Sequence, residues 1–159
     1  MLAKTHILFG AGLALTASHV ANLSVQTTLF VVCSGAIGGL LPDIDHPSST
    51  FGRRIWPVSL VISKVFGHRG ITHSLLAMAG LTFLLLSGYH LPAVGLGLIL
   101  GYLSHLLGDF ITPHGIPLFW PYSKCYRIPC PIRTGGFGES VLGLLVVFAG
   151  AAWAWNRFA

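Results

Sequence analysis

The sequence predicts an all-α membrane protein, with about five transmembrane helices and a metal site at their cytoplasmic ends. Of its 159 residues, 53% are hydrophobic and only 8% are charged, against about 25% charged residues in a soluble domain. Several apolar stretches approach the ~20 residues that cross a bilayer core. Nearly all acids and histidines fall where helix ends share one side of the membrane. We expect a single domain over residues 1–159.

The first expected helix resembles a signal peptide, because a positive charge precedes a short apolar run. Thr5 and His6 stand at the start of that run, however, and a clear A-x-A-like cleavage site is missing. We therefore expect a retained helix over 6–22. After a short uncharged turn, a second helix over 26–41 is expected to end at Pro42, because proline cannot continue an α-helix.

Three further helices alternate with two polar connections. The first connection contains a mildly amphipathic stretch, 56–66, of the kind that lies in the headgroup layer. The third helix is expected to end near His90 and the fourth at Pro113. The expected helices are 6–22, 26–41, 72–89, 92–112 and 139–157, and the expected cytoplasmic loops are 42–71 and 113–138.

Small residues recur at helical spacing in two of these helices. Gly35 and Gly39 are four residues apart in the second helix, and Gly97 and Gly101 in the fourth. Such pairs let helices approach closely in lipid. They predict tight packing and carry no information about chemistry.

The polar residues gather on one side of the predicted bundle. Successive helices run in opposite directions. One side of the membrane therefore holds the starts of the first, third and fifth helices and the ends of the second and fourth. All four acids and six of the eight histidines fall there. The exceptions, His19 and His90, are expected at the opposite interface without a catalytic part. The acids are Asp43, Asp45, Asp109 and Glu139.

The basic residues follow the same division. Of the nine Lys and Arg residues, only Arg157 lies on the opposite side. This fits the positive-inside rule and predicts a site that faces the cytoplasm of a bacterial-type inner membrane. The net charge of +5 is spread over short loops without a nucleic-acid-binding module, so we expect membrane lipid as a partner and no nucleic acid. The three cysteines form no disulfide framework.

The segment 41–47 places three potential ligands within four residues: Asp43, Asp45 and His46. Carboxylate oxygen and imidazole nitrogen together suit Zn²⁺, Mn²⁺ or iron, and two nearby carboxylates can bridge two ions. The alternative is a polar turn in which an aspartate caps a short helix. We expect Asp43 and Asp45 to bind the metal and His46 to support them from outside the ligand set.

The segment 67–74 contains His68 and His73, whose separation suits a bend from a loop into a helix. Both are expected metal ligands. Thr72 is expected to cap the third helix. Arg69 is a candidate catalytic residue that could hold a phosphate or carboxylate through paired hydrogen bonds, and its alternative role is that of a topology charge.

His105 and Asp109 are four residues apart in the fourth helix, so both project from one helix face. An ionisable pair inside an apolar helix is costly and indicates a functional site. The alternative is a buried pair that satisfies itself, with Asp109 orienting His105. Such a pair can still belong to a ligand set, and we expect both residues to bind the metal.

Three residues elsewhere complete the expected site. His6 opens the first helix on the same side and is an expected metal ligand. Glu139 opens the fifth helix, where the helix dipole favours a carboxylate in any case, and is the second candidate catalytic residue. His114 is expected to support the site in the same way as His46.

The three segments, followed by Thr112 and Pro113, resemble the YdjM family, whose members are described as inner-membrane metal-dependent hydrolases, in some cases under LexA control. The resemblance runs from Thr5 to about Pro121. It implies that the functional set is Asp43, Asp45, His68, His73, His105 and Asp109. A fainter similarity to zinc-dependent phospholipase C and related nucleases, which also have an early histidine and a His-x3-Asp helix, favours phosphoester chemistry. Their amino-terminal Trp ligand is missing here.

The leading hypothesis is a membrane-embedded hydrolase with one to three divalent ions, zinc first, with Mn²⁺ or Fe as alternatives. The metal would lower the pKa of bound water towards ~7, and a histidine or Glu139 would move a proton to the leaving group. Arg69, with Arg53, would hold an anionic headgroup of a lipid or lipid-linked phosphoester. The alternatives are a metal-ion or proton transporter and a scaffold in which the metal serves folding alone.

Overall fold

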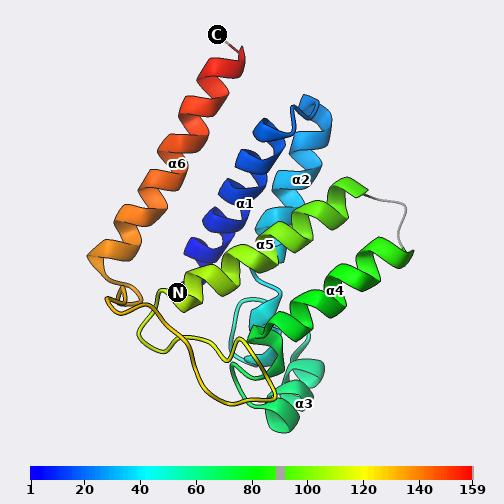
Figure 1. Ribbon diagram of the computed structural model, residues 1–159, viewed down its shortest axis with the longest axis vertical. Helices are drawn as coiled ribbons and strands as arrows, with labels where there is room; N and C mark the ends of the chain where they lie inside the picture. Colours follow the sequence, from blue (N-terminus) through cyan, green and yellow to red (C-terminus); the bar gives the residue numbers. More distant parts are fainter. Residues whose placement is uncertain (89–91, 159) are drawn as a thin grey trace.

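The computed structural model describes the backbone of residues 1–88 and 92–158, and the side-chain environment at all of these except 88, 151, 154 and 156–158. Within these ranges the fold is all-α and contains no strand. The positions expected for His90 and for the Arg157 side chain lie outside the described residues. The helices are α1 (Ala3–Val20), α2 (Val25–Gly38), α3 (Trp56–Phe66), α4 (Leu75–Gly88), α5 (Pro92–Phe110) and α6 (Phe137–Phe158), with 3₁₀ turns η1 (Pro42–Asp45) and η2 (Ile71–His73) (Figure 1).

The start of α4 corrects one expectation from the sequence. Thr72 does not cap this helix, because η2 ends at His73 and the Ser74 hydroxyl accepts the N–H of Ala77 (3.2 Å) at the beginning of α4. The Thr72 hydroxyl instead donates to Asp45 Oδ2 (2.5 Å). His73 therefore lies in a tight turn ahead of the helix, where its ring is directed towards neighbouring elements.

Two helical segments have the length and apolar composition to cross a membrane: Val25–Asp45 and Pro92–Phe110. Three shorter apolar helices accompany them, at Trp56–Phe66, Leu75–Ser87 and Phe137–Gly150. The count of five membrane spans therefore stays a prediction.

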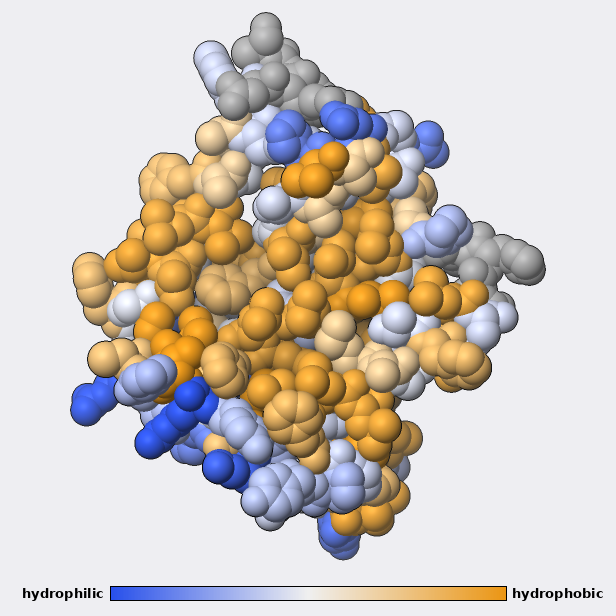
Figure 2. Space-filling model, viewed as in Figure 1, coloured by the Kyte–Doolittle hydropathy of each residue, from blue (hydrophilic) through white to orange (hydrophobic). Residues whose placement is uncertain are grey.

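The burial of side chains is the reverse of that in a soluble domain. Among the described residues, five hydrophobic side chains are buried, against fourteen polar or charged ones. Large apolar side chains are exposed on every helix, and Figure 2 shows a surface that is largely hydrophobic between two polar ends. An exposed apolar surface of this extent is typical of a protein embedded in lipid.

Three helices, α1, α2 and α5, pack against one another through glycine. A Cβ atom on Gly10 would lie 2.2 Å from the carbonyl oxygen of Gly35, and one on Gly101 would lie 2.1 Å from the same oxygen. A Cβ atom on Gly97 would lie 2.2 Å from the carbonyl oxygen of Val31. The three backbones are thus in direct contact, which confirms the close packing expected from the glycine spacing.

The remaining helices surround this three-helix core. α6 lies beside α1, and α4 lies beside α5, while α3 packs near η1 at the end of the molecule that holds the long connections (Figure 1). Gly80, on α4, would place a Cβ atom in open space. The core helices and the outer helices therefore differ sharply in how closely they are packed.

Candidate metal centre

Four separate elements bring expected ligands to one end of the bundle. His6 lies near the start of α1, and Asp43 lies in η1, directly after α2. His73 ends η2, and the last turns of α5 carry His105 and Asp109. The polar side chains therefore meet where the helix ends converge, as the alternating helix directions predict.

Four atoms from these elements face one another: His73 Nε2, His105 Nε2, Asp43 Oδ1 and Asp109 Oδ2. The two imidazole nitrogens are 3.2 Å apart. Asp43 Oδ1 lies 3.9 Å from the His73 nitrogen and 3.7 Å from the His105 nitrogen. Asp109 Oδ2 lies 3.7 Å and 3.9 Å from the same two atoms. The Asp43 side chain is 22% exposed and the other three are buried, so the set is accessible from the Asp43 side.

The spacing of this set fits a first-row metal ion. Zinc bound by imidazole nitrogen and carboxylate oxygen has bond lengths of about 2.0–2.2 Å, so a regular tetrahedron around it has edges of about 3.3–3.6 Å. The five distances that join each nitrogen to the other nitrogen and to the two carboxylate oxygens run from 3.2 to 3.9 Å. The ligand atoms of Asp43, His73 and His105 all lie within 4.8 Å of one another, and Asp43 and Asp109 together match the charge of a divalent ion.

The outer nitrogen of each histidine is engaged, which leaves the inner nitrogen unprotonated in a neutral ring. His105 Nδ1 donates to the carbonyl oxygen of Gly39 (2.7 Å), a group that can only accept. His73 Nδ1 lies 3.1 Å from Thr72 Oγ1 and 3.3 Å from Asp45 Oδ2. In these tautomers both Nε2 atoms present lone pairs to each other at 3.2 Å, an arrangement that a proton or a metal ion between them would stabilise.

Asp45 lies behind His73 and not among the four facing atoms. Its Oδ2 accepts the Thr72 hydroxyl (2.5 Å) and the backbone N–H of Arg69 (2.8 Å), and its Oδ1 lies 3.1 Å from His68 Nδ1. A buried carboxylate held in this way fixes the orientation of the imidazole beside it. The structure thus places Asp45 as the residue that orients a candidate ligand, and His68, whose side chain is 42% exposed, as its outer neighbour.

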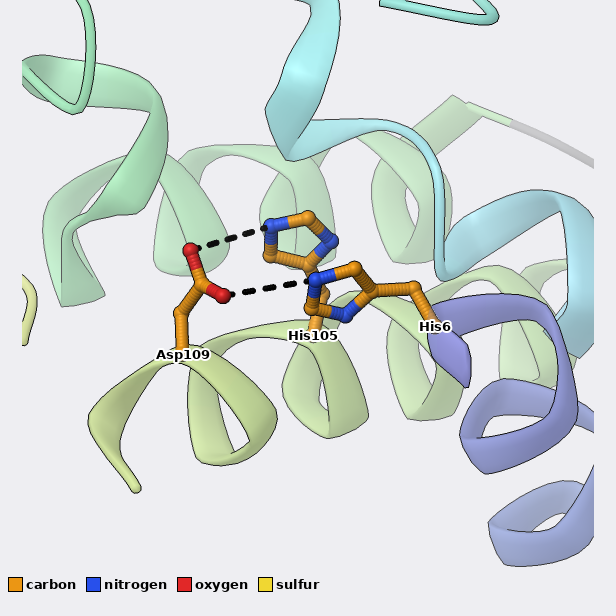
Figure 3. A group of neighbouring side chains, drawn as sticks. All are labelled: His6, His105 and Asp109. Carbon is orange, nitrogen blue, oxygen red and sulfur yellow. Dashed lines mark ion pairs between the residues drawn. The ribbon is translucent and has the colours of Figure 1, made fainter. Parts of the chain in front are cut away.

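Asp109 connects this set with a second one. Figure 3 shows its carboxylate beside the rings of His6 and His105, with one oxygen towards each ring. Asp109 Oδ1 lies 3.3 Å from His6 Nε2 and 2.5 Å from the amino group of Met1, and the two histidine rings stack with centroids 3.7 Å apart. The candidate ligand atoms of His6, His105 and Asp109 lie within 4.8 Å of one another. An aspartate with one oxygen towards each group is suited to bridge two ions.

Arg69 links the two buried aspartates. Its backbone N–H donates to Asp45, and its guanidinium Nη2 lies 2.8 Å from Asp109 Oδ2. A further guanidinium N–H donates to the carbonyl oxygen of Gly115 (3.1 Å). The φ angle of Arg69 is 58°, a left-handed conformation that costs a non-glycine residue of order 1 kcal/mol or more. These contacts hold the arginine at the edge of the candidate site in spite of that cost.

Glu139 is not brought to the four facing atoms. It is buried, its Oε1 accepts the N–H of Leu2 (2.7 Å), and its Oε2 accepts the N–H of Gly135 (2.6 Å). Oε1 therefore joins the start of α6 to the start of α1, and Oε2 holds the turn that directly precedes α6. These contacts account for a buried glutamate without a catalytic role.

The other residues considered from the sequence lie at the margin of the site. His46 Nδ1 is 2.9 Å from Ser48 Oγ, and its ring packs edge-on against that of His68, with centroids 4.5 Å apart. Arg53 and His114 are exposed. In the part of the chain that the structure describes, no hydrogen bond or ion pair connects these two residues with the four facing atoms.

Two supporting residues, Gly39 and Tyr102, are absent from the set expected from the sequence. The Tyr102 hydroxyl donates to the backbone carbonyl of Thr72 and so secures η2 against α5. Tyr102, His105 and Asp109 occupy positions i, i+3 and i+7 of one helix and share a face. That spacing is a signal by which Tyr102 could be found, whereas a backbone carbonyl such as that of Gly39 leaves no trace in the sequence.

Comparison with known proteins gives consistent matches along the whole chain. The family described as YdjM inner membrane protein matches residues 1–159. The inner membrane protein YdjM of Escherichia coli (strain K12) is 39% identical over 161 residues, which cover 96% of this chain and 82% of that protein, and the Shigella flexneri protein of the same name matches equally. The uncharacterized protein YvsG of Bacillus subtilis (strain 168) is 37% identical over 142 residues, or 89% of this chain and 87% of that protein. No solved structure matches the chain.

Proposed function

The chain belongs to the YdjM family of inner membrane proteins, and we propose that it is a membrane-embedded, metal-dependent hydrolase. Its substrate is a lipid or another phosphoester at the cytoplasmic interface of a bacterial inner membrane. The names of the relatives support the inner-membrane location. The reaction and the substrate are inferred from the candidate site.

One observation carries the metal assignment: the Nε2 atoms of His73 and His105 face each other at 3.2 Å. A proton or a metal ion can relieve the repulsion between two such lone pairs. Asp43 Oδ1 of η1 and Asp109 Oδ2 of α5 each lie within 3.9 Å of both of these nitrogens. Two nitrogens and two carboxylate oxygens from three chain segments, η1, η2 and α5, form the donor set of a divalent transition metal, zinc first, with manganese or iron as alternatives.

The chain's own residues supply the other parts of a hydrolytic site. A divalent ion in this set would supply Lewis-acid polarisation and activation of water. Arg69 has five N–H donors in its guanidinium group and uses two of them on Asp109 and Gly115. Its side chain is 21% exposed, so further donors are available to an anionic substrate oxygen. Asp45 and Gly39 hold the two histidine rings in place.

The packing of the bundle disfavours the transporter alternative. An ion that passes through the membrane needs polar groups along its path. Beyond the site, the backbones of α1, α2 and α5 touch at Gly10, Gly35 and Gly101, which leaves no space for water between them. This close packing supports a site at one end of the bundle over a pathway between α1, α2 and α5.

The first test is the metal content of detergent-purified protein, measured by mass spectrometry. We expect near-stoichiometric zinc, manganese or iron in the wild type and its loss in His73→Ala and His105→Ala. His114→Ala is the matched control, because this exposed histidine lies on the same side, and its metal content should equal that of the wild type. Absence of a transition metal from the wild type, even after reloading, would refute the metal centre.

Turnover is tested on the same proteins with phospholipid vesicles, by release of the phosphorylated headgroup. Metal-loaded wild type should hydrolyse the lipid, and Arg69→Ala should lower the rate about 10²-fold while it retains its metal. A protein that binds its metal, loses its fold on chelation and hydrolyses no phosphoester would instead support the scaffold alternative.

A further inference from the structure

A groove of about 550 Å³ runs along α1 between α5 and α6, next to the candidate metal centre but outside its ligands. Its walls include Phe9 and Leu13 of α1, Leu107 of α5 and Ala149 of α6. In Figure 2 the surface between α6 and α5 is hollowed and hydrophobic. The groove exists because α6 packs on α1 and leaves α5 uncovered on that side.

The polar side chains that line the groove are Thr16 and Ser104 along its length and His19 and Trp153 at its far end. The hydroxyl of Thr16 donates to the carbonyl oxygen of Gly12 (2.9 Å), and the hydroxyl of Ser104 donates to that of Gly101 (2.7 Å). Both hydroxyls are therefore satisfied within their own helices. The part of a ligand that lies along Thr16 and Ser104 is therefore apolar, because a polar group there would lose its hydrogen bonds to water without replacement.

The length of the groove matches one leaflet of a bilayer. Along α1 it extends from Phe9 to His19, which corresponds to about 15 Å at a rise of 1.5 Å per residue. The hydrocarbon core of a bilayer is about 30 Å thick, so one leaflet contributes about half of that. His19, near the carboxyl end of α1, contacts Trp153 edge-on with ring centroids 6.2 Å apart, and this pair closes the far end of the groove.

The other end of the groove reaches the candidate site. Phe9 follows His6 by three residues on α1, and Ser104 and Leu107 flank His105 on α5. A chain that lies in the groove therefore places whatever is attached to it beside His6, His105 and Asp109.

We propose that this groove binds one hydrocarbon chain of a membrane phospholipid and holds the headgroup at the metal centre. The identification of this lipid as the substrate rests on the proposed function. A hydrolase of this kind would take the lipid laterally from the surrounding leaflet. Binding of the chain itself requires neither the metal nor turnover.

The test uses photolabelling in lipid nanodiscs, with a phosphatidylglycerol that carries a diazirine in one acyl chain. After illumination, labelled peptides are located by mass spectrometry. We expect labels concentrated on the groove faces of α1, α5 and α6. Equal labelling of the exposed residues of α4 and of the outer face of α6 would mean ordinary annular lipid and would overturn the proposal.

Two variants fill the groove from opposite walls. Ala149→Trp and Leu107→Trp should each reduce labelling of α1 about tenfold, because the indole occupies the space of a chain segment. Leu145→Trp, at an exposed position of α6 outside the groove, is the control and should leave it unchanged. Unchanged labelling in both groove variants, each confirmed as folded by its thermal transition, contradicts the proposal.

The metal-free variant His105→Ala separates the two proposals. Labelling of α1 in this variant shows that the chain binds independently of the metal. If the wild type hydrolyses the lipid but the label shows no preference for the groove, the chain site alone is refuted. Labelling of the groove in a protein that hydrolyses no phosphoester would refute the proposed function alone.

Discussion

The three-helix core and the outer helix α4 differ in how closely they pack against their neighbours. In the core, α1, α2 and α5 touch backbone to backbone, and a single methyl group on Gly101 would overlap the Gly35 carbonyl. On α4, none of the residues 75–87 is buried, and Gly80 faces open space. The candidate ligands come mainly from the ends of the core helices. The molecule thus combines closely packed core helices, whose ends carry the candidate ligands, with a loosely packed outer helix whose apolar side chains are exposed.

The largest expected effect comes from a matched pair of glycine substitutions. Gly101→Ala should lower the free energy of unfolding by about 3 kcal/mol or more, because the new methyl meets only backbone atoms that cannot yield. Gly80→Ala, the same change on α4, should raise it by about 0.5–1 kcal/mol through the lower backbone entropy of alanine. Thermal unfolding in detergent measures both. Equal effects would show that the two regions do not differ in packing.

A smaller effect is expected at Asp45. Asp45→Asn keeps the size of the side chain but weakens the contact that orients His73. The metal affinity should fall about 10–100-fold, as at other residues that orient a metal-bound histidine, while the metal still binds at saturating concentration. Competition with a chelator gives the affinity. Complete loss of metal, as expected for His105→Ala, would return Asp45 to the ligand set predicted from the sequence.

The smallest effect is expected where α6 joins the core. Glu139→Gln exchanges one acceptor oxygen for an amide that cannot accept the N–H of Leu2 or of Gly135. This should lower the free energy of unfolding by about 1 kcal/mol and leave the metal content unchanged. Hydrolysis by the variant should stay within about twofold of the wild type. A large loss of turnover in a stable, metal-loaded variant would restore the catalytic role considered from the sequence.

The sequence indicates on which side of the bundle a residue lies, but not which atoms meet there. Helix direction and spacing suffice to bring His6, His105 and Asp109 together, and the glycine pairs suffice to predict the packed core. The role of Asp45 depends on the contact between η1 and η2, which are distant in the sequence. The spacing of residues does not encode such a long-range contact. Glu139 was expected in the site because it lies on the correct side, yet its partners are the backbone amides that happen to adjoin the start of α6.

The contact between His6 and Asp109 also has a consequence for biosynthesis. A chain that enters the membrane from its amino-terminal end presents α1 and α2 long before α5 has been made. Until α5 arrives, His6 lacks its carboxylate, and Asp43 lacks His105. Loading of the proposed metal would therefore be a late event in biogenesis, at the step when His6 and Asp43 first meet their partners on α5.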